Sequence, residues 1–241
     1  MEPRYIDAMK KEEYVYHVFE NVAEGYDAAN NRISLGLHRR WKRRAMERTL
    51  AAVPPEGRLL DLCCGTGDMT ALALKMKPGL RVTGLDFSPA MLAQAEKRLG
   101  QDSRVELIRG DAMALPFSEN SFDGAIISFA LRNTADYQRV LEEMVRVVKP
   151  GGSLCCIDSF RPLSPIIRPF YDIYFSVLMP LLGGGKEKFS EYRWLCRSTR
   201  DFVSPPELRG LMERSGLKNT VQDSFLFGSC VSLCARKEER P

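Results

Sequence analysis

Apolar and polar residues follow two different periods along this chain, and those periods predict its elements. Over residues 11–50 the apolar residues recur at helical spacing, as in "YVYHVFENVAEGYD", with an interruption at Gly25 and an end at Pro54 and Pro55. From residue 58 to residue 160, short apolar runs alternate with amphipathic stretches. Strands that alternate with helices in this way predict parallel crossovers in a doubly wound α/β sheet.

The individual strands of this sheet can be named from the sequence. We expect strands in "RLLDLCC", "RVTGLDF", "RVELIRGDA", "FDGAIISFAL" and "SLCCIDSF". Ser88 followed by Pro89 predicts an N-capped helix start after the second of them. The segment "KNTVQDSFLFGSCVSLCARK" predicts two closing antiparallel strands. The expected fold is therefore Rossmann-like: a mostly parallel sheet with an antiparallel hairpin at its C-terminal end.

The domain organisation follows from where the alternation of strand and helix patterns continues and where it is interrupted. Residues 51–241 are expected to form one domain, with residues 1–50 as a helical segment packed on it. Residues 161–200 break the alternation, because they are rich in aromatic residues, proline and leucine. We expect this segment to be an insertion that covers a substrate site.

Composition and charge narrow the function classes. The chain has 241 residues, 44% hydrophobic and 27% charged, which is typical of a globular protein. The net charge of +4 is too small to indicate a nucleic-acid partner by itself. No apolar window resembles a signal peptide or a spanning helix, so we expect a cytoplasmic protein. The seven cysteines contain no C-x-x-C pair, which disfavours a metal site, and we expect them to be reduced.

A glycine turn after the first strand is the first candidate for chemistry. Gly65 and Gly67 in "GTGD" can bring backbone N–H groups close to a ligand, although such a turn can equally be structural. Asp86 ends the second strand, where a carboxylate can accept both ribose hydroxyls of an adenosine. Its alternative role is that of an acid at the N-terminus of the next helix.

The third and fourth strands end near the same place. Asp111 can accept a hydrogen bond from an adenine amino group, with the backbone of Ala112 at the ring edge, and Ser128 ends the fourth strand at the mouth of the same cleft. The spacing lacks the full G-x-G-x-x-G of a pyrophosphate loop. Adenosine binding without a pyrophosphate loop on this fold indicates S-adenosyl-L-methionine as the ligand, without a metal.

The chain resembles a known family along nearly its whole length. The segments "VFENVAEGYDAANNRISLGLHRRWKR", "LDLCCGTGDMT", "GDAMALPFSENSFD", "ISFALRN", "EMVRVVKPGG" and "YRWLCRSTRDF" are similar to those of the C-methyltransferases of menaquinone and ubiquinone biosynthesis, which are class I methyltransferases. Within the family, the last segment resembles the menaquinone-pathway enzymes more closely. The extra proline in "FVSPPEL" and the ending "VSLCARK" depart from the family pattern and leave the quinol open. The resemblance implies these cofactor contacts: Thr66, Asp86, Asp111, Ala112 and Ser128.

The resemblance implies methyl transfer to a ring carbon that becomes nucleophilic when a neighbouring phenol ionises. Arg132 in "LRN" is the candidate that stabilises the phenolate and orients a water for the proton, and Asn133 can bind the quinol oxygen. Tyr26, with Asp27 beside it, can close over the reacting groups. The alternative for Arg132 is an ion pair with a nearby acid, and the alternative for Tyr26 is a core aromatic.

The expected partners follow from a prenylated quinol substrate. Residues 165–185 can supply an apolar channel for the prenyl tail, and the basic run "HRRWKRR" at residues 38–44 either contacts anionic lipid at the inner face of the membrane or is a solvated helix face. A homodimer is also kept open. Methylation of a ubiquinone precursor or of another lipid-like phenol, and a non-catalytic scaffold role in a quinone-synthesis complex, are the alternative functions.

Overall fold

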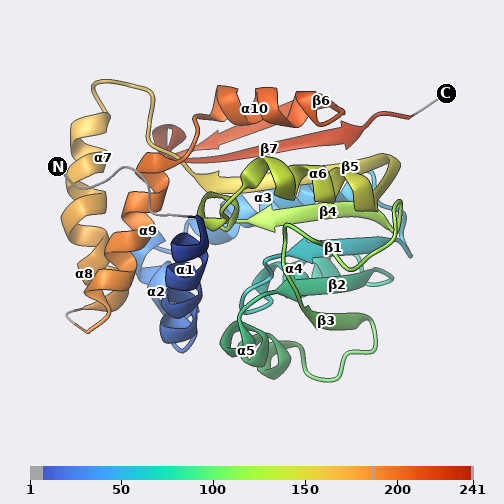
Figure 1. Cartoon of the computed structure of the whole chain (residues 1–241), viewed down its shortest axis with the longest axis horizontal. Coiled ribbons are helices and arrows are strands. Elements are labelled where there is room, and N and C mark those ends of the chain that lie inside the picture. Colours follow the sequence, from blue (N-terminus) through green and yellow to red (C-terminus); the bar gives the residue numbers. More distant parts are fainter. Residues whose placement is uncertain (1–7, 186, 240–241) are drawn as a thin grey trace.

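A seven-stranded sheet runs through the molecule in the order β3-β2-β1-β4-β5-β7-β6 (Figure 1). This computed structural model describes residues 8–185 and 187–239. The first five strands pair in parallel, whereas β7 is antiparallel to both of its neighbours. The predicted fold class is therefore confirmed. The strands are β1 (Arg58–Leu62), β2 (Arg81–Asp86), β3 (Val105–Arg109), β4 (Phe122–Ser128), β5 (Val148–Ser159), β6 (Leu217–Phe225) and β7 (Cys230–Lys237).

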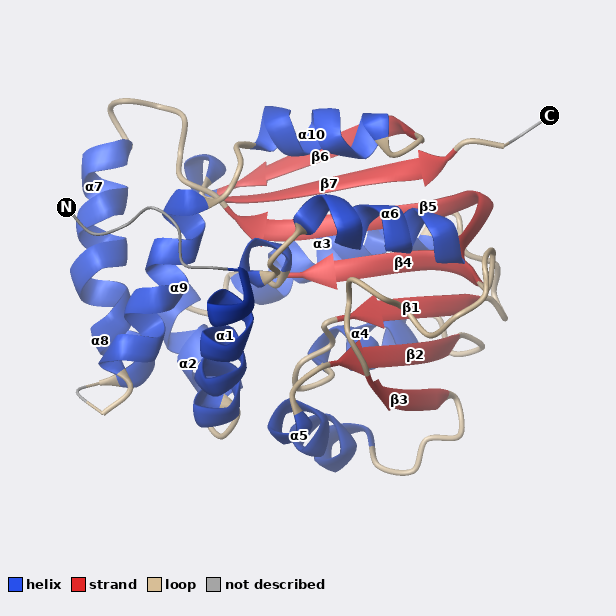
Figure 2. Ribbon diagram, in the orientation of Figure 1, coloured by secondary structure: helices blue, strands red, loops and turns tan. Residues whose placement is uncertain are grey.

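Helices lie on both sides of this sheet and also gather beyond one of its ends (Figure 2). The predicted N-capped start at Ser88 is confirmed, because its Oγ accepts a hydrogen bond from the Met91 amide at 3.1 Å and Pro89 is the first helical residue. The helices are α1 (Ala8–Val22), α2 (Tyr26–Ser34), α3 (His38–Leu50), α4 (Asp68–Met76), α5 (Pro89–Leu99), α6 (Tyr137–Val147), α7 (Arg168–Ile173), α8 (Met179–Gly184), α9 (Phe189–Asp201) and α10 (Pro205–Arg214).

Neighbouring strand residues bury their side chains on opposite faces of the sheet. Leu60 and Leu62 of β1 pack in the cluster that includes α6 and α10, whereas Leu59 packs in the cluster that includes α3 and α4. This alternation is what a parallel strand covered by helices on both faces requires. The two clusters hold the parallel strands rigidly, so that their carboxyl ends form a fixed edge for a site.

The helices beyond the end of the sheet have an apolar cluster of their own. Buried residues of α1, α2, α8 and α9 pack together there, with Tyr192 as its largest fully buried side chain. Glu20 of α1 also accepts hydrogen bonds from the Ser88 hydroxyl at 2.6 Å and from the Ala90 amide at 3.1 Å. The N-terminal helices are thus held against α5 and against the cover segment. The domain boundary at residue 50 remains a prediction.

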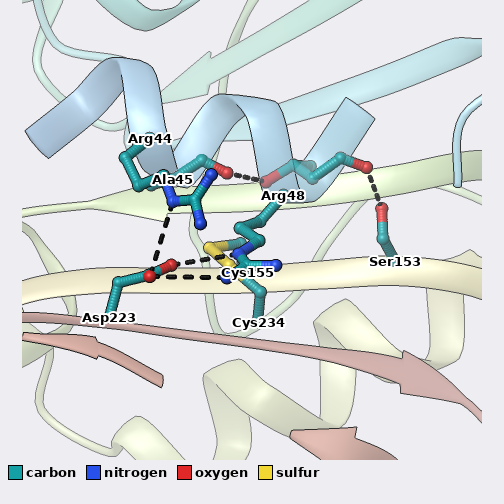
Figure 3. The surroundings of a disulfide bond; sticks show 8 residues. Arg44, Ala45, Arg48, Ser153, Cys155, Asp223 and Cys234 are labelled. Carbon is teal, nitrogen blue, oxygen red and sulfur yellow. Dashed lines mark hydrogen bonds and ion pairs between the residues drawn. A yellow bond between two sulfur atoms is a disulfide. The ribbon is translucent and has the colours of Figure 1, made fainter. Parts of the chain in front are cut away.

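One expectation about the cysteines is wrong. Cys155 of β5 and Cys234 of β7 are joined by a disulfide (Figure 3). The register of the antiparallel pair places these two residues directly opposite each other, although they are 79 residues apart in the sequence. A search for closely spaced cysteine pairs cannot detect such a pairing. The free cysteines are Cys63, Cys64, Cys156, Cys196 and Cys230.

Helix α3 passes over this disulfide and is itself held to the edge strand β6 by ion pairs (Figure 3). Arg44 and Arg48 form ion pairs with Asp223 of β6, at 3.4 Å and 3.1 Å. Within the described ranges, no group of three or more His, Cys, Asp or Glu side chains is arranged to hold a metal ion. None of the helices described is long and apolar enough to cross a membrane. Parts of the predicted N-terminal, cover and C-terminal segments, namely residues 1–7, 186 and 240–241, lie outside the described residues.

Candidate active site

A cavity of about 270 Å³ opens at the carboxyl ends of the parallel strands. We call it the strand-end cavity. It is the place where an open α/β sheet with this order of strands binds its ligands, because the crossovers diverge there. Most of the residues predicted for the cofactor and for catalysis line it together: Tyr26, Gly65, Thr66, Asp86, Asp111, Ala112, Ser128 and Asn133.

The two glycines of the turn after β1 have different jobs. Gly65 lines the cavity with a φ of +54°, and a Cβ added there would meet nothing within 4 Å. Gly67 does not line the cavity, and a Cβ there would lie 2.9 Å from Leu99 Cδ1 and 3.2 Å from Ala95 Cβ. Glycine at 67 therefore permits the close approach of α5, whereas Gly65 leaves its backbone open to a ligand. Gly67 as a cofactor contact remains a prediction.

Asp86 is buried at the end of β2, with 4% of its surface exposed. Its carboxylate accepts hydrogen bonds from the Gly65 amide at 2.8 Å and from the Ser88 amide at 3.0 Å. Burial raises the pKa of this carboxyl group, and the backbone amides only partly offset that effect. Asp86 thus fixes the glycine turn and the start of α5, the role given as its alternative, and also lines the cavity.

Several polar groups of this cavity have no partner in the part of the chain that the structure describes. The Ser128 hydroxyl and both the amide nitrogen and the amide oxygen of Asn133 are buried without a hydrogen bond. An unsatisfied buried polar group costs about 1–3 kcal/mol, so such groups mark places where a polar ligand binds. These orphaned groups fit an adenosine-containing ligand of the kind predicted from the sequence.

The start of α2 closes over the glycine turn. The Thr66 hydroxyl donates a hydrogen bond to Asp27 at 2.9 Å, and Arg98 of α5 forms an ion pair with the same carboxylate. Asp27 itself is not among the residues that line the cavity. Asp27 instead ties the start of α2, next to Tyr26, to the glycine turn and to α5.

A second cavity, of about 210 Å³, lies among α2, α3, the cover helices and the turn between β6 and β7. We call it the cover cavity. Tyr26, Lys42 and Phe129 line both cavities, so the two meet at these side chains. Burial raises the pKa of Tyr26, while the nearby charges of Lys42 and Arg132 lower it in part. A group bound in one cavity therefore lies next to a group bound in the other.

Arg132 lines the cover cavity but not the strand-end cavity. Its guanidinium forms a buried ion pair with Asp158 and donates to the Phe129 carbonyl at 2.7 Å. This is the ion pair that the sequence offered as the alternative. The guanidinium Nε is buried without a partner among the described residues, so one donor is left for a ligand. The catalytic role of Arg132 remains a prediction.

Lys42 is a site residue that was not among those predicted from the sequence. Its side chain is buried and its Nζ lies 2.5 Å from Asp68 Oδ2, at the start of α4. Burial alone would lower the pKa of Lys42, but Asp68 raises it, so the side chain stays charged. The basic run 38–44 therefore has one member that points inward. The signal was available, because Trp41, Lys42 and Ala45 share a helical face with the apolar side of α3.

Comparisons with known proteins concern nearly the whole chain. Residues 7–237 match the model of the ubiE/COQ5 methyltransferase family. The demethylmenaquinone methyltransferase of Bacillus licheniformis is 44% identical over 220 residues, which cover 90% of this chain and 94% of that protein. The enzyme of the same name from Staphylococcus aureus is 40% identical over 236 residues, covering 97% of each.

Solved structures agree with the fold. A SAM-dependent methyltransferase of Thermotoga maritima superposes with a TM-score of 0.61 at 22% identity, covering 93% of this chain and all of that one, 100%. At this identity the likeness concerns the fold alone. It extends to the mostly parallel sheet with an antiparallel C-terminal end, the arrangement expected from the sequence.

Proposed function

This chain belongs to the ubiE/COQ5 methyltransferase family, and from that membership we propose that it methylates a ring carbon of demethylmenaquinol in menaquinone biosynthesis. S-adenosyl-L-methionine is the proposed methyl donor. The observation that carries the proposal is the meeting of the two cavities at Tyr26, Lys42 and Phe129. One cavity is bounded by polar strand ends that suit an adenosine, and the other is bounded by apolar helices that suit a prenylated ring.

In the proposed complex, Asp86 would accept the ribose hydroxyls, and Asp111 with the backbone of Ala112 would bind the adenine edge. The backbone of Gly65, with Thr66, would lie against the remainder of the donor. The orphaned hydroxyl of Ser128 lies in the same cavity and would gain a partner. This assignment uses the polar groups that the strand-end cavity leaves unsatisfied.

S-adenosyl-L-methionine, when bound, supplies a methyl group whose bond to sulfur breaks as its bond to the ring carbon forms. Arg132, through its free Nε, and Lys42 place positive charge beside the ring and favour the phenolate over the phenol. Asn133 lines the strand-end cavity, and its unpartnered amide N–H would donate to a quinol oxygen that reaches past the shared side chains Tyr26, Lys42 and Phe129. Arg132 also orients the water that accepts the proton leaving the methylated carbon.

The cover cavity suits the apolar part of the substrate. Tyr174, Phe175 and Met179 of the cover segment line it together with Leu195 of α9. Tyr26 lies where this cavity meets the donor cavity, and the ring carbon would approach the methyl group beside it. These cavity-lining side chains of the cover segment are thus proposed to bind the ring and the first prenyl units.

Location and partners are part of the same proposal. We place the protein in the cytoplasm, where its prenylated substrate requires contact with the inner face of the membrane. The basic run contributes only through its outward residues, Arg39, Arg40 and Arg43, because Lys42 is buried. A homodimer is compatible with the proposal, and sedimentation would detect it as a doubled mass.

Turnover with a panel of demethylated naphthoquinols and benzoquinols, followed by mass spectrometry, tests the proposed function. The expected product is the naphthoquinol with one methyl group added to its ring. Preference for benzoquinols would move the enzyme to ubiquinone biosynthesis. Donor binding without methylation of any acceptor would support a scaffold role instead.

A further inference from the structure

The outer face of the cover helices is apolar. From α7 through the π-helical residues Tyr174–Leu178 to α8, the chain stays helical and carries exposed large apolar side chains. Phe170 is 72% exposed, Ile173 63%, Val177 50% and Leu181 48%. Their spacing of three and four residues places them on one side of the helical run.

The opposite side of the same helices is apolar as well. Tyr171 is buried, and Tyr174, Phe175 and Met179 line the cover cavity. The polar residues Asp172 and Ser176 lie on a third side of the run and are engaged by Arg161 and Arg200. An apolar outward face is expected in a core or against a membrane, whereas the outward face of a helix at a protein–water boundary is polar. These helices lie at the edge of the molecule, far from the sheet, with none of the described residues over their outer face (Figure 1).

Two turns at the rim of the cover cavity expose further apolar side chains. Leu35 is 83% exposed, Leu226 53% and Phe227 74%. All three have a left-handed backbone, with φ of 51°, 44° and 57° respectively. Bulky residues rarely adopt this conformation, and it recurs here in exposed apolar side chains around one cavity mouth.

Helix α2, which leads into the Leu35 turn, is joined to the cover helices. The Tyr174 hydroxyl donates to the Ile33 carbonyl, and Arg32 donates to the Leu182 carbonyl at 2.9 Å. Leu35 and Leu226 line the cover cavity together with residues of the cover helices. The exposed apolar groups therefore surround one opening instead of being scattered over the surface.

Positive charge lies on the exposed side of α3, the helix whose residues His38, Trp41 and Lys42 line the cover cavity. Arg39, Arg40 and Arg43 follow Leu37 on α3, are exposed, and have no ion-pair partner among the residues that the structure describes. Their neighbours Arg44 and Arg48 are engaged by Asp223. Unpaired arginines next to an apolar surface are complementary to an anionic lipid surface, where each basic residue adds to the attraction.

We propose that the cover helices α7–α8, the Leu35 turn and the Leu226–Phe227 turn form one docking surface for an anionic lipid bilayer. This inference rests on the proposed function and names the partner of its substrate cavity. The apolar side chains enter the boundary of the acyl chains, and the three arginines bind headgroups. A prenylated quinol then passes from the bilayer into the cover cavity without crossing water.

Flotation with vesicles tests this surface. The full-length protein is mixed with vesicles of phosphatidylcholine alone, or of phosphatidylcholine and phosphatidylglycerol, at physiological salt. We expect binding to the anionic vesicles, a loss of tenfold or more for Phe170→Ser with Ile173→Ser, and a comparable loss for Arg39→Gln with Arg43→Gln. The matched controls are Val221→Ser in β6 and Arg81→Gln in β2. They remove an exposed apolar and an exposed basic residue outside the docking surface, and they should bind like the wild type.

Turnover separates this inference from the proposed function. The docking variants should methylate a short-chain, water-soluble quinol at the wild-type rate and a long-chain quinol in vesicles at least tenfold more slowly. Unchanged vesicle binding in both double variants would overturn the docking surface. So would a dimer in sedimentation that Phe170→Ser with Ile173→Ser dissolves without any vesicle binding, since the face would then join two copies. Vesicle binding without turnover on any quinol would leave the surface standing and refute the function.

Discussion

The two cavities that meet at Tyr26 are built in different ways. The strand-end cavity takes most of its polar groups from residues at or just after the carboxyl ends of β1, β2, β3 and β4, so sheet topology brings these together, while helices add Tyr26 and Lys42. The cover cavity takes its walls from α2, α3, the cover helices and a C-terminal turn, which meet only through helix packing. Sheet topology can be derived from a sequence pattern, whereas such packing cannot. The first cavity should therefore tolerate changes in the second.

The largest expected effect concerns the cover cavity. Arg132→Ala leaves the buried carboxylate of Asp158 without its partner, which should lower the free energy of unfolding by about 3–5 kcal/mol. Urea unfolding measures this loss, and calorimetry should show little change in donor affinity for the folded protein. Equal losses of donor affinity and stability would show that the two cavities depend on each other structurally.

Asp158→Asn is the matched control for this change. It breaks the same ion pair but keeps the guanidinium, so it should lose stability and retain more turnover than Arg132→Ala. If both variants lost turnover equally, the role of Arg132 would be structural.

A smaller effect is expected in the strand-end cavity. Asp86→Ala should weaken binding of S-adenosyl-L-methionine tenfold or more, by about 1.4 kcal/mol or beyond, because it removes the ribose acceptor and loosens the Gly65 turn. Titration calorimetry measures the affinity. Asp123→Ala is the control, since Asp123 accepts a hydrogen bond from the Arg58 amide at 2.8 Å at the amino ends of β4 and β1, away from the cavity at their carboxyl ends. Unchanged affinity in Asp86→Ala would refute the ribose assignment.

The last effect is spread over several pH units and concerns Asp61 of β1, which within one pH unit changes the stability by about as much as Asp86→Ala changes donor binding. Burial raises its pKa from 3.8 to about 7, although Thr70 donates to it at 2.7 Å. Between these values the folded protein holds a proton that the unfolded chain releases, so stability is full below pH 4 and falls as pH rises towards 7. The slope should be about 1.4 kcal/mol per pH unit.

Urea unfolding of the wild type and of Asp61→Asn at several pH values between 4 and 8 measures this contribution. The substitution should flatten the fall, because asparagine does not titrate and can still accept the Thr70 hydroxyl. Parallel curves for the two proteins would show that Asp61 is ionised in the folded state.

The sequence predicted the features that depend on residues close together along the chain. The strand pattern, the Ser88 cap and the antiparallel C-terminal strands are confirmed because each depends on neighbouring residues. The residues assigned to strand ends also line one cavity, although their individual roles remain predictions. Local pattern and sheet topology suffice for that much.

Contacts between residues far apart in the sequence could not be predicted from the pattern of apolar and polar residues. The disulfide between Cys155 and Cys234 depends on strand register, and the Lys42–Asp68 ion pair depends on how α3 lies against the start of α4. A basic run suggests a solvated face because its charges are usually exposed. Only the contacts of α3 show that one lysine of the run is buried.

The wall shared by the two cavities has a thermodynamic consequence. Tyr26, Lys42 and Phe129 contact whatever occupies either side. Any factor by which the methyl donor changes the affinity for the quinol must equal the factor by which the quinol changes the affinity for the donor. The demethylated donor, which lacks the positive sulfonium, should feel the charge of Lys42 differently. Methyl transfer therefore changes how strongly the ligand in one cavity affects the affinity of the other cavity. The same side chains that favour substrate binding then also influence product release.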